Sequence, residues 1–290
     1  MLMTSCASDD EQETAPVAEP SADAIVLTAS MGDGGSTRGS QDVQTASFDE
    51  GELVSVEITP IGGSMQSSVY RAGAATEGNG YKNPLTAYSR AITWPANNGT
   101  VNIRAYYPST VASSTTAFTV QADQSADDDY KLSDLMYADA VNGQSKVSSV
   151  PLTFHHALSK IVVNIVGTGG VSSDIFADCE VAVKACKTVT ITNGVADATA
   201  ATDYGYIKIG TGATVAGIIV PQTIDGSSTA QPFIRVKLNN KNLYFKLTGS
   251  KTFAERKKYT YTLSIGPSDS ISLIKSEITD WQNVDLITSM

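Results

Sequence analysis

Apolar and polar residues alternate through most of this chain, and that alternation limits what the chain can fold into. The pattern begins with Ile25, Leu27 and Ala29. It recurs in the ranges 54–58, 101–107, 234–238, 243–247 and 259–265. A period of two places successive side chains on opposite faces of an extended strand, whereas an amphipathic helix needs a period of about 3.6. Helical periodicity is confined to 130–140 and 173–177. The pattern therefore predicts an all-β protein.

Two further segments strengthen the β assignment. Residues 160–166 are apolar on nearly both faces, which is typical of a strand buried in the centre of a sheet. The segments 234–238 and 243–247 are joined by Asn239-Asn240-Lys241-Asn242. Asparagine tolerates the left-handed backbone that tight turns require, so this spacing predicts a β-hairpin.

The length and the breaks between strands predict two domains. The chain has 290 residues, more than the roughly 100 to 200 residues of one domain. Breaks rich in Gly and Ser interrupt the strands at 31–40, 72–80 and 142–149. The last break divides the body nearly in half. We therefore predict two β-sandwiches in series, spanning residues 23–148 and 149–290.

The charge balance and the supply of reactive side chains exclude several function classes. The 20 basic and 30 acidic residues leave a net charge of -10, the wrong sign for neutralising the phosphates of a nucleic acid. No apolar run approaches the roughly 18 residues of a membrane-spanning helix. Histidine occurs twice and cysteine three times, and no phosphate-binding loop or nucleophile elbow is present. We predict no enzyme activity, no cofactor, no metal site and no nucleic-acid partner.

The first 22 residues contain a candidate anchor followed by a candidate tether. The segment from Leu2 to Cys6 resembles the end of a bacterial lipoprotein signal peptide, whose cysteine becomes lipidated. The basic and apolar regions of such a signal are missing, so this interpretation requires a start further upstream. Residues 7–22 are acidic and rich in Ala and Pro, which predicts a disordered tether. They also resemble the acidic export signal of surface lipoproteins in Bacteroidales-type bacteria. The alternative is a chance cysteine in a floppy terminus.

The histidines and the two downstream cysteines favour structural roles. His155 and His156 are neighbours on a predicted strand, so they point to opposite faces and belong at a sheet edge or a domain junction. Cys179 and Cys186 are seven positions apart. On one extended strand that is about 23 Å, beyond disulfide reach. A disulfide requires a chain reversal between them; otherwise both are buried thiols.

An acidic run and two tryptophans also have structural explanations. Residues 123–129 contain four aspartates, which suit calcium chemically, but the run lacks the glycine and the distal glutamate of an EF-hand loop. We interpret it as a solvated acidic loop. Trp94 and Trp281 are candidates for a sugar-stacking platform, and core packing is the favoured interpretation for both.

An ordered set of motifs, spread over about residues 36 to 281, resembles the Mfa-like fimbrillins. These are pilus subunits and accessory proteins of Bacteroidales-type bacteria. The matches are, in order, Thr37-Arg38 before Phe48, Trp94-Pro95, Ala105 to Pro108, Asp134 to Ala138, Val150 to Val163, Val220 to Thr223, Lys258 to Leu263 and Ile278 to Trp281. One departure is Glu255-Arg256-Lys257, where the family commonly has a Gly-containing turn.

The resemblance implies two transthyretin-like β-sandwich domains, a lipoprotein precursor and a place in a surface fimbria. It also implies assembly by strand exchange. A protease cuts after an arginine, here Arg38, the first strand leaves, and an extended segment of a neighbouring subunit fills the groove. Ile25, Leu27 and Ala29 would be the apolar plugs of the displaced strand. The tail after Trp281 is long enough to act as a donor strand. The alternative for Arg38 is a solvated arginine in an uncut accessory subunit.

The function that follows is a structural or adhesive fimbrial subunit, anchored in the outer membrane through a lipid on Cys6 and displayed on the cell surface. Its partners would be other fimbrial subunits, with a host or bacterial surface ligand as a further class. The competing function is a glycan-binding surface lipoprotein, which would need two or three coplanar exposed aromatic residues. A hydrolase ranks third and would need clustered acids in a deep cleft.

Overall fold

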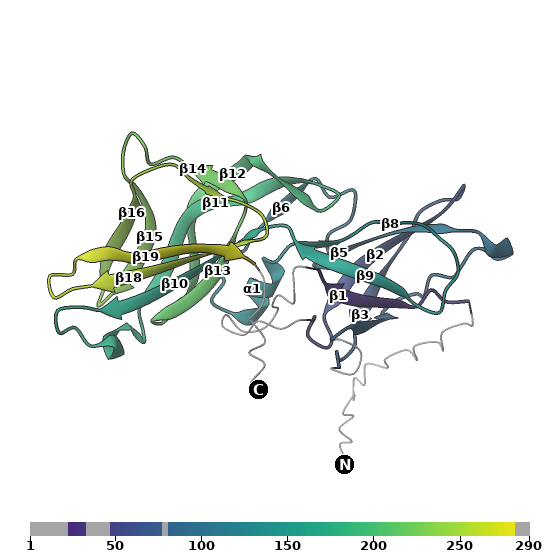
Figure 1. Ribbon diagram of the computed structural model, residues 1–290, viewed down its shortest axis with the longest axis horizontal. Coiled ribbons are helices and arrows are strands. Elements are labelled where there is room, and N and C mark those ends of the chain that lie inside the picture. Colours follow the sequence, from purple (N-terminus) through teal and green to yellow (C-terminus); the bar gives the residue numbers. More distant parts are fainter. Residues whose placement is uncertain (1–22, 33–46, 77–80, 282–290) are drawn as a thin grey trace, which may run out of the picture.

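The computed structural model describes residues 23–32, 47–76 and 81–281. Within these ranges nearly all regular structure is β-strand, which confirms the predicted fold class (Figure 1). Three features of the sequence lie outside the described residues: Cys6 with its tether, Arg38, and the tail after Trp281.

Helix is scarce among the described residues. The α-helix α1 (Asp127–Leu132) begins earlier and ends earlier than the predicted window 130–140. Its first turn consists of three aspartates, and carboxylates are stabilising at the positive end of a helix dipole. The window 173–177 holds the 3-10 helix η3 (Ser173–Phe176), and η2 (Ala96–Asn98) is a second short 3-10 turn. No helix in the described ranges is long and apolar enough to cross a membrane.

The first sheet closes on itself. Its order is β2-β3-β4-β1-β9-β7-β5-β8, and an additional pairing of β2 with β5 completes a ring. β8 branches from β5 outside the ring. The strands are β1 (Leu27–Met31), β2 (Leu53–Pro60), β3 (Gln66–Ala72), β4 (Asn83–Ala87), β5 (Val101–Tyr107), β7 (Met136–Ala138), β8 (Val141–Gln144) and β9 (Val150–His156). Because the ring is closed, its strands have no open edge facing another molecule.

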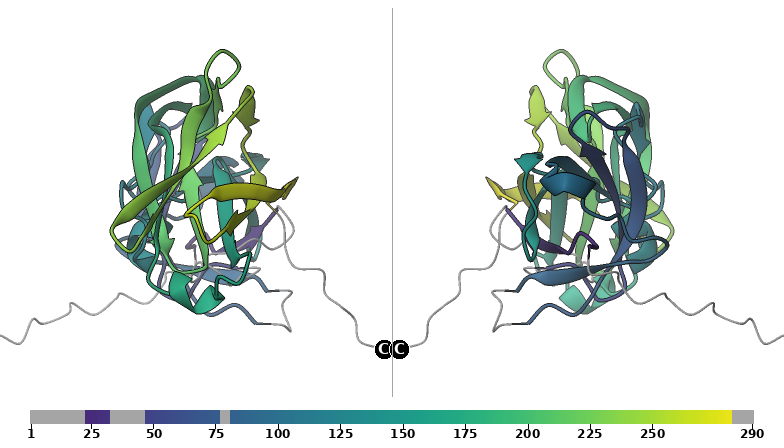
Figure 2. Two further views of the ribbon diagram at one scale, coloured as in Figure 1. Left: turned by 90° about the vertical axis from the view of Figure 1, so that its left-hand side faces the viewer. Right: turned by 90° about the vertical axis from the view of Figure 1, so that its right-hand side faces the viewer.

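The second half of the chain forms two facing sheets. The first has the order β13-β10-β18-β19, with β13 (Thr214–Ile219), β10 (Ser159–Gly167), β18 (Lys257–Ile265) and β19 (Ile271–Asp280). The second has the order β12-β11-β15-β16, with β12 (Val195–Thr211), β11 (Glu180–Thr192), β15 (Gln231–Leu238), β16 (Lys241–Leu247) and β6 (Ala117–Thr119) on β11. A small ladder joins β14 (Gln222–Ile224) to β17 (Lys251–Phe253). The left panel of Figure 2 shows the two layers, with yellow β18 and β19 opposite the green strands.

Two sequence predictions for the second half are confirmed. The segment 160–166 lies in β10, which is a central strand between β13 and β18. Strands β15 and β16 form the predicted hairpin. Asn239 and Asn240 both have positive φ angles, 47° and 62°, as a tight hairpin turn requires.

The hydrophobic side chains divide into two cores, one inside the ring and one between the facing sheets. The chain passes from the first sheet to the second between His156 and Ser159. The segment between β5 and β7 crosses the division, because Val111, Phe118 and Tyr130 pack into the second core. The domain boundary at residue 148 therefore stays a prediction, because the two cores are separate in space but no single cut in the sequence separates their residues.

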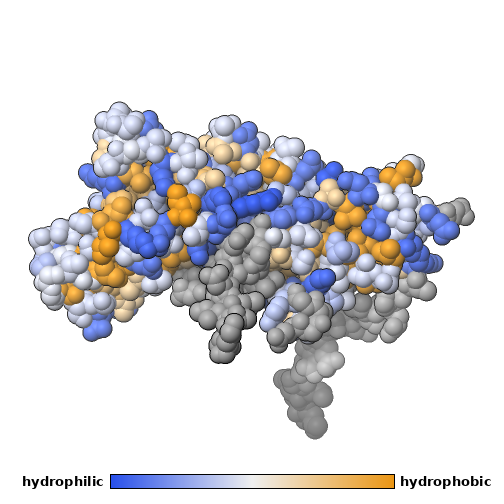
Figure 3. All heavy atoms as spheres, viewed as in Figure 1, coloured by the Kyte–Doolittle hydropathy of each residue, from blue (hydrophilic) through white to orange (hydrophobic). Residues whose placement is uncertain are grey.

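β19 forms the outer edge of its sheet and pairs only with β18 among the described strands. Nearly all of its side chains are exposed, including the apolar Leu273, Ile274 and Ile278. Figure 3 shows hydrophobic residues interspersed with hydrophilic ones on this face of the molecule. The strand therefore contributes little to the core.

Candidate functional site: the first strand and its slot

β1 is a member of the closed ring, between β4 and β9, although it begins only four residues after the described chain starts. It runs parallel to β9, with Leu27–Met31 opposite Val150–Phe154. On its other side it runs antiparallel to β4, with Leu27–Ala29 opposite Asn83–Leu85. We call the space between β4 and β9 the β1 slot. Removing β1 would open the ring and leave two unpaired strand edges above an apolar core.

The inward side chains of this segment fill the core of the ring. Ile25, Leu27 and Ala29 are 2%, 0% and 0% exposed and belong to the first core. Val26 points outward and is 49% exposed. The predicted alternation is therefore observed. Fully burying a large aliphatic side chain contributes roughly 1.5–3 kcal/mol, so Ile25 and Leu27 hold the strand mainly by burial.

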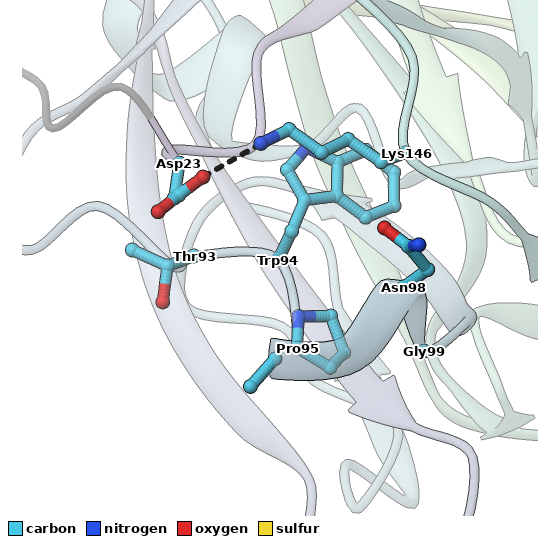
Figure 4. Close-up of a pocket in the computed structure, with 8 residues that line it drawn as sticks. Asp23, Thr93, Trp94, Pro95, Asn98, Gly99 and Lys146 are labelled. Atoms are coloured by element: carbon cyan, nitrogen blue, oxygen red, sulfur yellow. Dashed lines mark hydrogen bonds and ion pairs between the residues drawn. The ribbon is translucent and has the colours of Figure 1, made fainter.

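The N-terminal end of the segment is held at a hollow of about 400 Å³ (Figure 4). Lys146 Nζ lies 2.6 Å from Asp23 Oδ1, and the backbone N–H of Trp94 donates to Asp23 O at 2.9 Å. Ala24 forms a bridge with Thr93. Both members of the ion pair are substantially exposed to water. Such pairs contribute little, at most about 1 kcal/mol, so the backbone hydrogen bonds rather than the ion pair hold this end.

The other end of the segment continues the parallel ladder. The N–H of Gly32 donates to Phe154 O at 2.8 Å. A side chain at Gly32 would place its Cβ 2.3 Å from Cε1 of His155, so only glycine fits there. The segment 33–46, which contains Arg38, follows directly and lies outside the described residues.

The chain is fixed again immediately after that segment by a buried asparagine. The side chain of Asn83 accepts a hydrogen bond from Phe48 N at 2.8 Å and donates to Phe48 O at 2.9 Å and Gly73 O at 2.8 Å. The Phe48 ring packs edge-on against Phe154 with centroids 5.0 Å apart. We call this arrangement the Asn83 clamp. Its side-chain hydrogen bonds hold the downstream chain beside the slot, while the backbone of Asn83 lies opposite Ala29 of β1.

The end of β9 reaches the junction between the two cores. The ring of His156 stacks on Trp281 with centroids 3.9 Å apart and planes 7° apart, and its Nδ1 lies 2.7 Å from Asp134 Oδ1. All three side chains are almost completely buried. His155 is directed elsewhere, with Nε2 3.1 Å from Asp139 Oδ2. The predicted opposite orientations and the structural role at the junction are thus observed.

A sequence model of the fimbrillin-like family matches residues 37–281. The chain belongs to the fimbrillin-like family. The match begins just after the segment that enters the slot and ends at the buried Trp281. No curated protein sequence matches this fimbrillin-like chain at a significant level.

Solved structures share the fold of this fimbrillin-like protein. A putative cell adhesion protein from Bacteroides uniformis has a TM-score of 0.67 at 20% identity, covering 91% of this chain and 100% of its own. One from Bacteroides ovatus has a TM-score of 0.62 at 16% identity, covering 90% and 99%. A fimbrial assembly protein from Parabacteroides distasonis has a TM-score of 0.52 at 10% identity, covering 88% and 98%. At these identities the similarity concerns the fold.

The departure from the family turn has a structural explanation. Arg256 has a φ of 58°, the left-handed conformation that favours glycine. Its guanidinium lies over the ring of Tyr137, 5.5 Å from the centroid, and donates to the Tyr137 hydroxyl. Its backbone bonds Leu158 and Trp281. Contacts across the junction therefore hold an arginine in a strained position.

The remaining candidate residues take structural positions in this fimbrillin-like chain. Cys179 and Cys186 are free thiols; Cys179 is buried, which raises the pKa of its thiol, and Cys186 is half-buried. Trp94 is 7% and Trp281 0% exposed, so both tryptophans are core residues. Asp123 bonds Ser125 and Lys208. No cluster of three or more metal-ligating side chains occurs in the described ranges.

Sequence reasoning missed the residues that hold the slot. Asn83, Phe48 and Lys146 carry no periodic signal, because each acts through a partner distant in the chain. An asparagine before a proline, here Asn83 before Pro84, is typical of a turn. Only the tertiary structure identifies it as a clamp.

Proposed function

We propose that this protein is a structural or adhesive subunit, or an accessory protein, of a cell-surface fimbria, and that it assembles by exchanging β1 for a strand of a neighbouring subunit. The observation that carries the proposal is the position of β1. It is a terminal segment of the described chain, yet it completes a closed ring and covers an apolar core. The fimbrillin-like family is consistent with this role.

Exchange is physically reasonable because a donor strand can restore what β1 supplies. The donor would pair with β4 and β9, each main-chain hydrogen bond contributing about 1 kcal/mol net. Apolar side chains at alternate positions would replace Ile25, Leu27 and Ala29. A donor from another subunit therefore needs the same period of two that β1 shows.

Cleavage after Arg38 would make the exchange possible. A cut there leaves β1 attached to the ring only through noncovalent contacts, of which the Asp23–Lys146 pair is exposed. The Asn83 clamp keeps Phe48 in place, so the chain downstream of the cut would not follow β1 out of the slot. The sequence around Arg38 is rich in Gly and Ser, a composition typical of the loops at which proteases cut.

The decisive experiment treats the full-length protein with an arginine-specific protease and adds a synthetic peptide of residues 23–32. We expect release of the N-terminal segment by mass spectrometry, then polymer formation or peptide binding in the slot. Peptide carrying Leu27→Asp should not bind, because a carboxylate cannot enter the apolar core. Protein carrying Arg38→Gln should stay intact and monomeric. Cleaved protein that neither polymerises nor binds the wild-type peptide would refute strand exchange.

We also propose that Cys6 is lipidated and anchors the chain in the outer membrane, with residues 7–22 as the tether. Two or more acyl chains give stable anchoring at about 0.8 kcal/mol per buried CH2. Mass spectrometry of protein produced from the complete gene tests this directly. An unmodified Cys6 in that protein would refute the anchor without bearing on strand exchange.

The role within the fibre is tested by electron microscopy of the native surface with an antibody to this chain. A stalk subunit would be labelled along the fibre, whereas a tip or anchor subunit would be labelled at an end. Absence of the chain from fibres would refute the fimbrial proposal.

A further inference from the structure

The outer face of the five-stranded sheet carries a row of tyrosines. Tyr204 and Tyr206 lie on β12, and Tyr244 lies on β16. Their strand neighbours Ile207, Ile209 and Leu243 belong to the second core, so alternation directs the tyrosines outward. Tyr204 is 46% and Tyr244 39% exposed. In the left panel of Figure 2 this sheet forms the layer opposite yellow β18 and β19.

Two cations lie between the tyrosines. Lys184 Nζ is 5.2 Å from the ring centroid of Tyr204 and 5.8 Å from that of Tyr206. The guanidinium of Arg235 is 4.5 Å from the centroid of Tyr206, and Arg235 is the register partner of Tyr244. The five side chains therefore lie across four strands, with the two cations of β11 and β15 between the tyrosines of β12 and β16. We call them the tyrosine face.

The tyrosine face is electrostatically suited to a carboxylate. Lys184 forms no ion pair among the described residues, and Arg235 has one, to Glu180 at 3.0 Å. Burial raises the pKa of both Tyr204 and Tyr206, so their hydroxyls stay protonated and neutral at physiological pH.

A hollow of about 230 Å³ adjoins Tyr204. Polar side chains line it, namely Gln222, Thr223, Asp225 and Gln231. Gln222 is fixed by hydrogen bonds with the backbone of Cys186, which holds one wall in place. The hollow thus offers amide and hydroxyl groups, and the Asp225 carboxylate as an acceptor for sugar hydroxyls, beside an aromatic ring, whereas the cations that suit a carboxylate lie on the tyrosine face.

We propose that the tyrosine face and this hollow bind an acidic polysaccharide built from uronic acids. Aromatic rings pack against the apolar faces of sugar rings, and amide and hydroxyl groups beside them can bond sugar hydroxyls. Lys184 and Arg235 take the carboxylates. From β12 to β16 the face crosses three strand spacings, about 14 Å, which favours a chain of several sugars over a single one. This binding is independent of strand exchange.

The test measures binding of the intact full-length protein to polygalacturonate, with dextran as a neutral polymer and dextran sulfate as a charged polymer of the same backbone. We expect binding to polygalacturonate that exceeds binding to either control. Equal binding to dextran sulfate and polygalacturonate would show charge attraction alone and would overturn the proposal. No binding to polygalacturonate would also overturn it.

Variants of the tyrosine face distinguish the contribution of aromatic stacking to binding from the contribution of charge. Tyr204→Ala and Tyr244→Ala should each weaken polygalacturonate binding at least tenfold, and Lys184→Gln should lower the preference for polygalacturonate over dextran. The matched control is Tyr88→Ala, because Tyr88 is 51% exposed and its ring centroid lies 4.5 Å from the guanidinium of Arg71 on β3 of the first sheet. Equal losses of polygalacturonate binding in Tyr88→Ala and Tyr204→Ala would overturn the proposal. So would unchanged binding in both Tyr204→Ala and Tyr244→Ala. Circular dichroism of each variant checks that the fold is intact.

Discussion

β1 and β10 are paired in the same way but held very differently. Each is an interior strand with a parallel neighbour on one side and an antiparallel neighbour on the other. β10 pairs with β18 over Ser159–Gly167 and with β13 over Ser159–Asn164. β1 pairs with β9 over Leu27–Met31 and with β4 over only Leu27–Ala29. β10 therefore has about twice the ladder of β1 on each side.

The two strands differ equally in their connections. β10 follows β9 after two fully buried residues, Ala157 and Leu158, and continues into the second core. β1 is preceded by an exposed ion pair and followed by residues 33–46. The comparison teaches that pairing mode alone does not decide how permanent a strand is. Ladder length and burial on both faces differ between the two strands, and β1 is the weaker strand in both respects.

We expect the largest loss of stability from a substitution in β10. Ile161 is 0% exposed, so Ile161→Asp would bury a carboxylate without a partner and cost more than about 4 kcal/mol. We expect the second core to unfold, measured as lost amide-exchange protection over β10, β13 and β18. Ile274→Asp is the control, because Ile274 is 56% exposed on β19 and should change stability by less than about 0.5 kcal/mol. Unchanged amide-exchange protection of β10 in Ile161→Asp would contradict the conclusion that β10 is the more firmly held strand.

The second effect is expected in β1. Leu27→Ala removes a fully buried side chain from the ring and should lower its free energy of unfolding by about 3 kcal/mol. Protection of β10 should not change, because the two cores are separate. Val26→Ala on the same strand is the control, since Val26 is 49% exposed. Denaturant titration measures the free energy of unfolding, and amide exchange measures the protection of β10. A matching loss of protection in β10 would show that the strands do not act independently.

The third effect concerns the Asn83 clamp. Asn83→Ala leaves two backbone groups of Phe48 and one of Gly73 without their partner, at a cost of about 2 kcal/mol. After cleavage at Arg38, we expect residues following the cut to be digested further in this variant and to be protected in the wild type. Thr86→Ala, which removes an exposed hydroxyl on β4, is the control. Equal digestion of wild type and variant would show that the clamp does not hold the downstream chain.

The smallest effect is expected at the entrance to the slot. Lys146→Met removes the exposed pair with Asp23 and should destabilise the ring by no more than about 0.5 kcal/mol. Amide exchange of Ala24 to Val26 should become faster at low salt only, because salt screens the pair in the wild type. An effect that persists at high salt would show that Lys146 acts through packing rather than charge.

Much of the local structure follows from the sequence, because alternation specifies which side chains are buried. It identified the inward set Ile25, Leu27 and Ala29, the central strand at 160–166 and the hairpin at Asn239-Asn240. It did not place the helix correctly, since a three-aspartate first turn moved α1 upstream. It offered Trp94 and Trp281 as the aromatic platform, whereas both are buried and the exposed aromatic residues of the described chain are tyrosines, two of them on β12 and β16.

By itself, then, the sequence determined the β character of the chain, the inward and outward faces of its strands and, through ordered motifs, its fimbrillin-like family. The tertiary structure alone decided that β1 lies parallel to β9, more than 100 residues away, that Asn83 clamps Phe48, and that tyrosines from β12 and β16 share one face. The physical reason is that periodicity is a local property, set by the two faces of a strand. The choice of partner strand depends on which distant segments complete a common core and satisfy each other's hydrogen bonds.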